Sequence, residues 1–341
     1  GQSKSGSNQT PKFIYPYDVI DNYLFLPFAY GTILGISNPS KSLFRTSNLE
    51  FSGILRPEQK KVKSEALAHL NESGCTLISA FPGFGKTCTS IYISIKAGIK
   101  GILIIVHRIV LINQWKESIK TFVPNAKVQV LSATDEMEEC DFYIMNAINI
   151  PKKSYIFFKN IGFVIVDEAH LIIAEILGIS LQRLCPRYIL ALTATPTRPD
   201  GLDVLFDLYF GTKRIFRKLY CKHTVYKIET KFKPEVVKDE RGHLDWGTLL
   251  KSQCENIQRN DMIVRLVKMF SDKIILILCK RKNQAIYLVK KLTEEKVDVT
   301  SLIGTQQTFE KTSKVLVGMI QNTGVGFDHK KLTALILASD V

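Results

Sequence analysis

Short apolar runs rich in β-branched residues recur along the chain, and amphipathic helical patterns separate them. A run that is apolar at every position, rather than at alternate positions, is typical of a strand covered on both faces in a parallel sheet. The first series predicts strands at Thr76–Ala80, Gly101–Val106, Lys127–Leu131, Asp141–Met145, Phe163–Val166 and Tyr188–Thr193. The helices predicted between them are Gln59–Leu70, Lys86–Ala97, Leu111–Phe122 and Leu171–Leu184. Alternating strands and helices predict a doubly wound α/β domain.

A second series of the same kind begins late in the chain. Its predicted strands are Lys273–Cys279, Val297–Leu302, Lys314–Met319 and Leu332–Leu337. Its predicted helices are Asn260–Phe270 and Asn283–Lys291. This series predicts a second α/β lobe, and the sequence ends soon after its fourth strand.

The segments outside these two series give the expected domain boundaries. Residues 1–11 are polar and are expected to be disordered or tag-derived. Residues 12–50 are rich in aromatic residues and are expected to form a small N-terminal accessory element that packs on the core, with stacking on bases as the alternative. The two α/β domains are expected at 51–212 and 259–341, joined by a basic connecting segment at 213–258.

Charge and cysteine content narrow the class of protein. The 341 residues carry 46 Lys and Arg against 32 Asp and Glu, and this net charge of +14 favours a polyanionic partner such as nucleic acid. The basic segment 213–251 could contact that partner or be a solvated surface. None of the seven cysteines shows C-x-x-C zinc spacing, which predicts reduced thiols in an intracellular protein. No apolar run reaches the roughly 20 residues of a membrane span, so no membrane association is expected.

The segment from Ala80 to Thr87, AFPGFGKT, follows a predicted strand and opens a predicted helix, which is the context of a P-loop. Its two glycines let backbone N–H groups turn toward phosphate, and the helix N-terminus adds its positive dipole. Lys86 is expected to reach the β- and γ-phosphates, and Thr87 to bind Mg²⁺. Ala80 replaces the first glycine of the general pattern, so a glycine-rich turn that merely starts a helix is the alternative. The predicted nucleotide-binding residues of this loop are Pro82, Gly83, Phe84, Gly85, Lys86, Thr87 and Cys88.

Two carboxylates, Asp167 and Glu168, follow the predicted strand Phe163–Val166. Ligand sites in α/β sheets lie at the carboxyl ends of strands. Asp167 is therefore expected to bind Mg²⁺, and Glu168 to position and deprotonate an attacking water. A pair of acids that favours a helix start is the alternative, but the preceding P-loop supports the catalytic interpretation.

Together these two motifs resemble the superfamily 2 helicases, in which the sequence from Asp167 to His170 would be the DEAH box. The resemblance runs from about Leu55 to the end of the chain and implies two RecA-like P-loop NTPase lobes that use ATP and Mg²⁺. It adds His170 to the expected catalytic residues. It also implies that Gln59 contacts the adenine edge and that Arg56 supports this contact.

The resemblance extends to motifs that contact nucleic acid. Arg108 follows a strand end and is expected to grip a backbone phosphate, whereas Trp115 is expected in the core. Asn146 lies where another strand-contacting motif is expected. Thr193 and Thr195 would couple the nucleotide site to the polynucleotide. Arg198 extends this motif as in the branch that includes xeroderma pigmentosum B-type helicases, restriction-type translocases and helicases of large DNA viruses.

In the second lobe, Lys280 falls in the segment that resembles motif IV. The segment from Thr323 to Asp328 resembles motif V, which implies backbone approach to phosphate at Gly324. The same resemblance places Gly326 and Asp328 in the nucleotide-binding set. Met319 occupies the position where this motif usually has a threonine. The arginine-bearing motif VI does not appear, and the second lobe is therefore expected to be incomplete at its C-terminal end.

The expected function is an ATP-dependent DNA helicase or translocase with ATP hydrolase activity, in viral or nuclear transcription, replication or repair. DNA is favoured over RNA as the nucleic-acid partner, transcription or replication machinery is a further partner, and a monomer is favoured. The alternatives are a nucleoprotein or transcript-release remodeller that does not unwind, and an RNA helicase. A viral origin, with similarity to the poxvirus transcript-release helicase, would place the protein in the cytoplasm or nucleus of a host cell.

Overall fold

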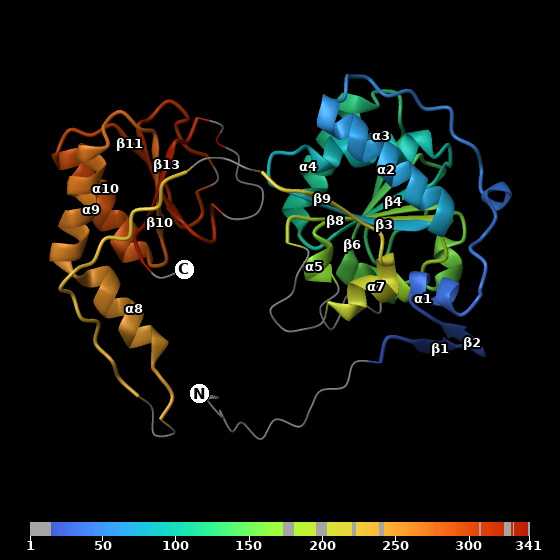
Figure 1. Cartoon of the computed structure of the whole chain (residues 1–341), viewed down its shortest axis with the longest axis horizontal. Helices are drawn as coiled ribbons and strands as arrows, with labels where there is room; N and C mark the ends of the chain where they lie inside the picture. The colour runs from blue at the N-terminus through green and yellow to red at the C-terminus, as the bar shows by residue number, and fades with distance from the viewer. Residues whose placement is uncertain are drawn as a thin grey trace. The chain divides into compact units, whose positions relative to one another are not determined.

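The computed structural model describes residues 15–172, 181–195, 203–219, 223–238, 242–306, 308–323, 329 and 331–339. The chain divides into two compact units, residues 1–222 and 223–341, whose element order can be followed in Figure 1. Both units are α/β with parallel sheets, which confirms the expected fold class.

Within the described residues, the first unit contains a seven-stranded sheet in the order β5-β6-β4-β7-β8-β3-β9, and every pair of neighbours is parallel. The strands are β3 (Cys75–Ala80), β4 (Ile102–Val106), β5 (Val128–Leu131), β6 (Phe142–Asn146), β7 (Phe163–Val166), β8 (Tyr188–Thr193) and β9 (Arg214–Arg217). The six strands predicted for this domain are confirmed, with ends that shift by no more than one residue. Their continuous apolar runs reflect burial on both faces.

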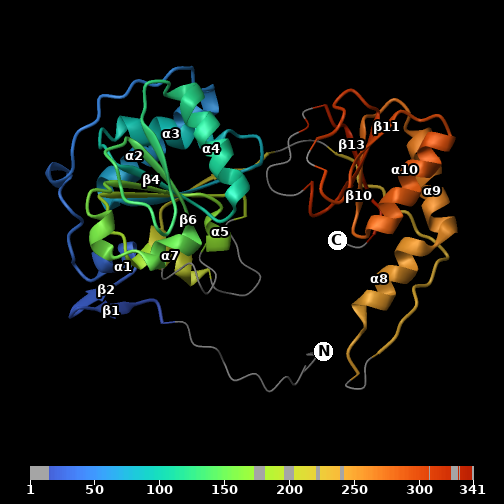
Figure 2. The same ribbon diagram turned by 180° about the vertical axis from the view of Figure 1, so that it is seen from behind.

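Helices cover both faces of this sheet, as Figures 1 and 2 show from opposite sides. One face carries α2 (Pro57–Ser73), α3 (Lys86–Lys96) and α4 (Ile109–Phe122), and the other carries α1 (Phe28–Ile33), α5 (Ala169–Ile172) and α7 (Val204–Phe210). Alternate residues of β4 divide between the two cores, because successive strand side chains point to opposite faces. Ile102 and Ile104 pack with the helices of the first face, whereas Leu103 and Ile105 pack with those of the second.

The first unit extends ten residues beyond the expected boundary at residue 212. The reason is β9, which lies in the expected connecting segment but pairs with β3 at the edge of the sheet. Its sequence, RIFR, contains a single fully buried residue, Ile215, so it has no apolar run that could have predicted a strand. Part of the basic charge expected in a linker therefore belongs to a sheet edge.

The described part of the N-terminal segment belongs to the first unit. It contains a hairpin of β1 (Asp18–Ile20) and β2 (Tyr23–Phe25), then α1 and the short 3-10 helix η1 (Lys41–Leu43). Beyond η1, the backbone N–H of Lys100 donates to the carbonyl of Arg45, and the neighbouring residue Thr46 forms a bridge with Ile99.

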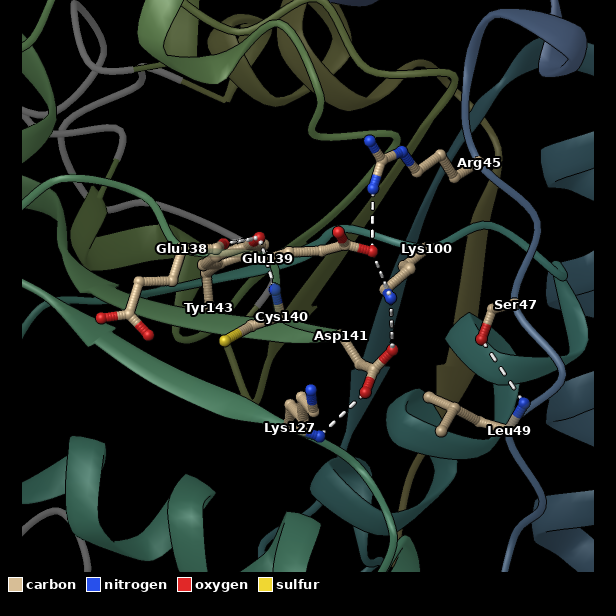
Figure 3. Close-up of polar contacts among 10 residues, drawn as sticks. All are labelled: Arg45, Ser47, Leu49, Lys100, Lys127, Glu138, Glu139, Cys140, Asp141 and Tyr143. Atoms are coloured by element: carbon tan, nitrogen blue, oxygen red, sulfur yellow. Dashed lines mark hydrogen bonds and ion pairs between the residues drawn. The ribbon is translucent and has the colours of Figure 1, made fainter.

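Figure 3 shows the ionic contacts that accompany this attachment. Arg45 Nη1 lies 2.8 Å from Glu139 Oε1, and Lys100 Nζ lies 3.0 Å from the same oxygen. Lys100 Nζ also lies 3.8 Å from Asp141 Oδ1. Since Arg45 and Glu139 are mostly exposed, these pairs orient the segment more than they stabilise it.

Two further 3-10 helices, η2 (Ala147–Lys152) and η3 (Tyr155–Phe158), connect β6 to β7.

No helix in the described part of the chain is long and apolar enough to cross a membrane. The cysteines in that part are all free thiols.

In the second unit, the described residues form a four-stranded parallel sheet in the order β11-β12-β10-β13. The strands are β10 (Ile275–Cys279), β11 (Val299–Leu302), β12 (Val315–Met319) and β13 (Ala334–Leu337), and the helices are α8 (Trp246–Glu255), α9 (Ile257–Met269) and α10 (Lys282–Glu294). The four predicted strands and both predicted helices are confirmed. Helix α8 lies within the expected connecting segment, where Asp245 caps it by accepting hydrogen bonds from the N–H groups of Gly247 and Thr248.

Candidate functional site

The expected P-loop and the Asp167-Glu168 pair meet at one edge of the first sheet. Strands β4, β7, β8 and β3 are consecutive neighbours in the sheet, so their carboxyl ends lie side by side. The residues that follow these strand ends begin at His107, Asp167, Ala194 and Phe81. Such an edge is the usual ligand site of an open parallel sheet.

Two glycines in the left-handed region shape the loop between β3 and α3. Gly83 has φ +83° and Gly85 has φ +85°, and Gly85 is also the N-cap of α3. A Cβ atom on Gly83 would meet nothing within 4 Å, whereas one on Gly85 would lie 2.5 Å from Gln59 Nε2. The loop is therefore open at Gly83 and closely packed at Gly85.

Between these glycines, Phe84 is buried and packs edge-on against Phe81. Of the loop residues in the expected nucleotide-binding set, Phe84 therefore has a side chain that belongs to the core, while Pro82 is exposed and Cys88 is half-buried.

Lys86 and Thr87 begin α3. The ammonium group of Lys86 donates a hydrogen bond of 3.0 Å to the carbonyl of Ala80, at the end of β3. Lys86 and Thr87 are both partly exposed. A flexible ammonium held by one neutral carbonyl can exchange this partner for a phosphate oxygen, because a charged acceptor gives the stronger hydrogen bond.

Arg56 and Gln59 connect the start of α2 to the P-loop. Gln59 Oε1 accepts from the backbone N–H of Arg56 at 2.8 Å, and Gln59 Nε2 donates to the carbonyl of Phe84 at 3.0 Å. The guanidinium of Arg56 donates to the same carbonyl and to that of Gly83. Gln59, expected to contact adenine, is thus 4% exposed. Its Nε2 braces the loop at Phe84, whereas its Oε1 caps the start of its own helix α2. One of its two amide protons has no partner among these bonds.

The carboxylate of Asp167 is held on both oxygens. Oδ2 accepts a 2.8 Å hydrogen bond from the indole Nε1 of Trp115, and Oδ1 accepts a 3.0 Å hydrogen bond from the backbone N–H of Glu168. Burial raises the pKa of Asp167 to about 6, and the indole hydrogen bond acts against this effect. Trp115 was expected in the core and is 1% exposed there, but its contact with Asp167, 52 residues away, was missed.

Glu168, His170, Thr193 and Thr195 form a connected polar group. Glu168 Oε2 is buried without a hydrogen bond to any described residue and lies 3.5 Å from His170 Nδ1. The same His170 nitrogen lies 2.9 Å from Thr193 Oγ1. The Thr193 hydroxyl donates to the carbonyl of Thr195 and accepts from its N–H. Glu168 also has φ +48°, an uncommon conformation for a residue with a side chain.

His107 is a second residue that sequence reasoning missed, although it lies between the predicted strand Gly101–Val106 and Arg108. Both of its ring nitrogens are buried and lack a hydrogen-bond partner among the described residues. Burial, together with the charges of Arg108 and His170, lowers the pKa of His107 to about 4. The ring is therefore neutral near pH 7. Only its position at the end of β4, next to Asp167 in the sheet, identifies it as part of this edge.

The residues expected to contact nucleic acid are less closely grouped. Arg108 is exposed and is the N-cap residue of α4, without a side-chain capping bond. Asn146 ends β6 and accepts from the N–H of Ile148, which gives it a local capping role. Lys280 follows β10 in the second unit and has an exposed side chain. Arg198, Gly324, Gly326 and Asp328 lie outside the described residues.

The residues at this sheet edge supply oxygen donors for a metal ion, but the described part of the chain holds no cluster of three or more His, Cys, Asp or Glu that could form a complete metal site. A magnesium ion commonly takes one or two protein oxygens and completes its shell with water and phosphate. The hydroxyl of Thr87 and the carboxylate of Asp167 fit that pattern. The nearby charge of Glu168 adds to burial in raising the pKa of Asp167, an effect that a bound cation would offset.

The sequence is similar to one protein family and to several viral proteins. Residues 52–198 match the family described as "Type III restriction enzyme, res subunit". The chain is 39% identical to "Putative helicase 161L" of Invertebrate iridescent virus 6, over 99% of this chain and 82% of that protein. It is 29% identical to "Putative helicase 055L" of Frog virus 3, over 93% of this chain and 75% of that protein.

Among solved structures, the "Sulfolobus solfataricus SWI2/SNF2 ATPase core in complex with dsDNA" covers 87% of this chain and 84% of its own, with 14% identity and a TM-score of 0.48.

Proposed function

The chain belongs to the family of viral helicases that includes its relative from Invertebrate iridescent virus 6, and we propose that it is a nucleic-acid-stimulated ATPase that couples ATP hydrolysis to movement along DNA. One observation carries this proposal. The P-loop, the Asp167-Glu168 pair and Thr193 come from three neighbouring strands and converge at a single sheet edge. A metabolic kinase would need the first two features but would have no use for the hydrogen-bonded group from Glu168 to Thr195.

In this proposal, the backbone N–H groups around Gly83 and the N-terminus of α3 bind the phosphates of ATP. Lys86 moves from the carbonyl of Ala80 to the β- and γ-phosphates. Arg56 and Gln59 hold the loop in its binding conformation, and the remaining amide proton of Gln59 is available to the adenine ring. Cys88 and Pro82 belong to the same proposed binding set. Gly326 and Asp328 are proposed members of this set only through the resemblance of their segment to motif V, because they lie outside the described residues.

Thr87 and Asp167 would hold a Mg²⁺ ion, which would neutralise charge on the phosphates when bound. Glu168 accepts the proton of the attacking water. Its Oε2 accepts no hydrogen bond from a described residue, so it has a lone pair available for this role. His170 keeps Glu168 oriented through its 3.5 Å contact.

Thr193 and Thr195 transmit the state of the nucleotide site. The Thr193 hydroxyl bonds to His170 on one side and to the backbone of Thr195 on the other, so a shift of His170 changes the hydrogen bonds of the exposed Thr195 segment. Thr195 and Arg198 then act on the nucleic acid, together with Arg108, Asn146, Lys280 and Gly324. The net charge of +14 supports a nucleic-acid partner.

DNA is the proposed substrate, since the relatives belong to DNA viruses and the motif extension from Thr193 to Arg198 resembles that of DNA translocases of the xeroderma pigmentosum B branch. We place the activity in viral transcription, replication or repair, in the cytoplasm or nucleus of the host cell.

ATP hydrolysis by the whole protein, measured with single-stranded DNA, duplex DNA or RNA, tests this function. DNA should raise the rate, and Lys86→Ala should lower the stimulated rate by about 10²-fold or more, as expected when a donor to the developing charge is lost. Glu168→Gln should lower it by about 10²–10⁴-fold and still bind ATP. If no nucleic acid raises the rate, the proposal is wrong. If DNA does raise the rate, a strand-displacement assay on a forked duplex distinguishes the two activities. Displacement indicates unwinding, and hydrolysis without displacement indicates remodelling without unwinding.

A further inference from the structure

Trp115 reaches the candidate site from the interior of the first unit. It lies on the buried stripe of α4 with Leu111 and Ile119, four residues before and after it. Its ring is 1% exposed, and only its N–H points to a polar partner, Asp167 Oδ2, at 2.8 Å. The ring cannot move away without leaving a cavity, so the hydrogen bond is held in place by the packing of the core.

The chemistry of this donor is well suited to a carboxylate that must bind a cation. A buried carboxylate without partners is costly, and most proteins satisfy it with Arg or Lys. An indole N–H is a neutral donor, so it satisfies one lone pair of Asp167 and leaves the negative charge uncompensated. The backbone N–H of Glu168, also neutral, satisfies Oδ1 at 3.0 Å. Two neutral donors on the two oxygens fix the rotation of the carboxylate and leave its remaining lone pairs for a cation.

We infer that Trp115 is a positioning residue whose indole N–H orients the Asp167 carboxylate toward a Mg²⁺ ion that enters with the nucleotide. The inference rests on the proposed function for the identity of the ion. It assigns to a core tryptophan a contribution to magnesium affinity, in addition to its packing. Outer partners of metal ligands typically change metal affinity or activity by about 10–100-fold when they are removed.

The first experiment compares Trp115→Phe with Trp246→Phe in the full-length protein. Phenylalanine keeps an aromatic ring in the core and removes the N–H donor. Trp246 is the other of the two tryptophans and is 61% exposed on α8, so its replacement is a matched control. DNA-stimulated ATP hydrolysis is measured as a function of Mg²⁺ concentration. We expect Trp115→Phe to raise the half-saturating Mg²⁺ concentration about tenfold or more, with most of the rate recovered at saturation, and Trp246→Phe to leave both unchanged.

The second experiment needs no catalysis. Protein labelled with ¹⁵N in its two indole groups gives two N–H resonances, which the two phenylalanine variants assign. Addition of Mg²⁺ with ADP should move the Trp115 resonance and leave that of Trp246 in place. Asp167→Asn should move the Trp115 resonance in the free protein, because an amide is a weaker acceptor than a carboxylate. These measurements decide the inference even if Trp115→Phe does not fold.

Failure of this inference is distinguishable from failure of the proposed function. Two results would overturn the positioning role while the ATPase proposal stands. One is an unchanged Mg²⁺ dependence of hydrolysis in folded Trp115→Phe. The other is a Trp115 resonance that shifts neither in Asp167→Asn nor on addition of Mg²⁺ with ADP. The converse result is that nucleic acid fails to stimulate hydrolysis while the Trp115 resonance still responds to Mg²⁺ with ADP. That result would support the positioning role and contradict the motor function.

Discussion

At the scale of single residues, the candidate site depends on a few side chains whose partners come from distant parts of the chain. Gly85 is the clearest case, because its φ of +85° strains any residue with a Cβ and an added Cβ would displace the side-chain amide of Gln59. The motif identifies Gly85 as part of a P-loop. The contact with Gln59 adds a second reason, which motif spacing does not contain.

The pair Gly85→Ala and Gly83→Ala separates these two reasons. Both residues have nearly the same positive φ, so both variants carry a backbone penalty of about 1–2 kcal/mol. Only the Cβ at Gly85 meets another group, at 2.5 Å from Gln59 Nε2. We expect Gly85→Ala to weaken binding of a fluorescent ATP analogue clearly more than Gly83→Ala, as measured by titration. Equal losses would show that the Gln59 contact has no influence on the loop.

The neutral His107 predicts a pH dependence of stability. Its pKa of about 4 in the folded protein lies below the ordinary value of 6.5, so the unfolded chain binds the proton more readily between these two pH values. The folded state therefore loses stability as the pH falls from about 6.5 toward 4. Asp167 acts in the opposite direction, since its raised pKa of about 6 favours proton uptake by the folded state.

His107→Gln isolates the histidine contribution, since glutamine has no titrating group. We expect the melting temperature of the wild type to fall more between pH 7.5 and pH 5.0 than that of the variant, as measured by thermal unfolding in matched buffers. Parallel pH profiles for the two proteins would contradict a buried, neutral His107.

At the scale of elements, the part of the N-terminal segment that follows η1 packs on the first unit through the side chain of Phe44 in addition to its ion pairs. Phe44 packs among the partly buried residues of the core between the sheet and helices α2 to α4. Its ring also lies against Gly162, where an added Cβ would come within 2.8 Å of Phe44. The adjacent Leu43 is 74% exposed.

These two neighbours give a matched test of the attachment. Phe44→Ala should lower the free energy of unfolding of the first unit by about 2 kcal/mol, below the cost of a fully buried Phe because the ring is half-buried. Leu43→Ala should change it by less than about 0.5 kcal/mol, as for other surface substitutions. Urea unfolding followed by circular dichroism measures both. A loss below about 0.5 kcal/mol in both variants would show that the Phe44 ring contributes little to the attachment.

The elements also show where sequence patterns are informative. The central strands were predicted from their apolar runs because both of their faces are buried. β9 and α8 were missed because each is short and mostly polar. Their positions also depend on distant partners: β9 pairs with β3, and α8 packs on α10. No local pattern contains that information.

At the scale of the whole molecule, the excess of 14 positive charges predicts a strong effect of salt on nucleic-acid binding. Each phosphate contacted in duplex DNA contributes about −0.9 to the slope of the logarithm of affinity against the logarithm of salt concentration. We expect affinity for duplex DNA, measured by fluorescence anisotropy, to fall by one to three orders of magnitude between 50 and 200 mM salt, as about 2–5 such contacts imply.

Lys86→Ala is the control for this measurement, because Lys86 bonds to Ala80 in the P-loop and is proposed to contact the nucleotide rather than DNA. Its salt dependence should match that of the wild type. An affinity for DNA that does not change with salt would show that the positive charge serves solubility only.

The sequence by itself determined the α/β class, the central strands of both units and the order of the motifs at the candidate site. It could do so because burial on both faces and tight turns leave local signatures in residue type. The tertiary structure alone decided that β9 completes the first sheet, that Gln59 braces the loop at Gly85, and that Trp115 holds Asp167 across 52 residues. These features depend on which distant surfaces come into contact when the layers pack, and the local sequence does not indicate those contacts.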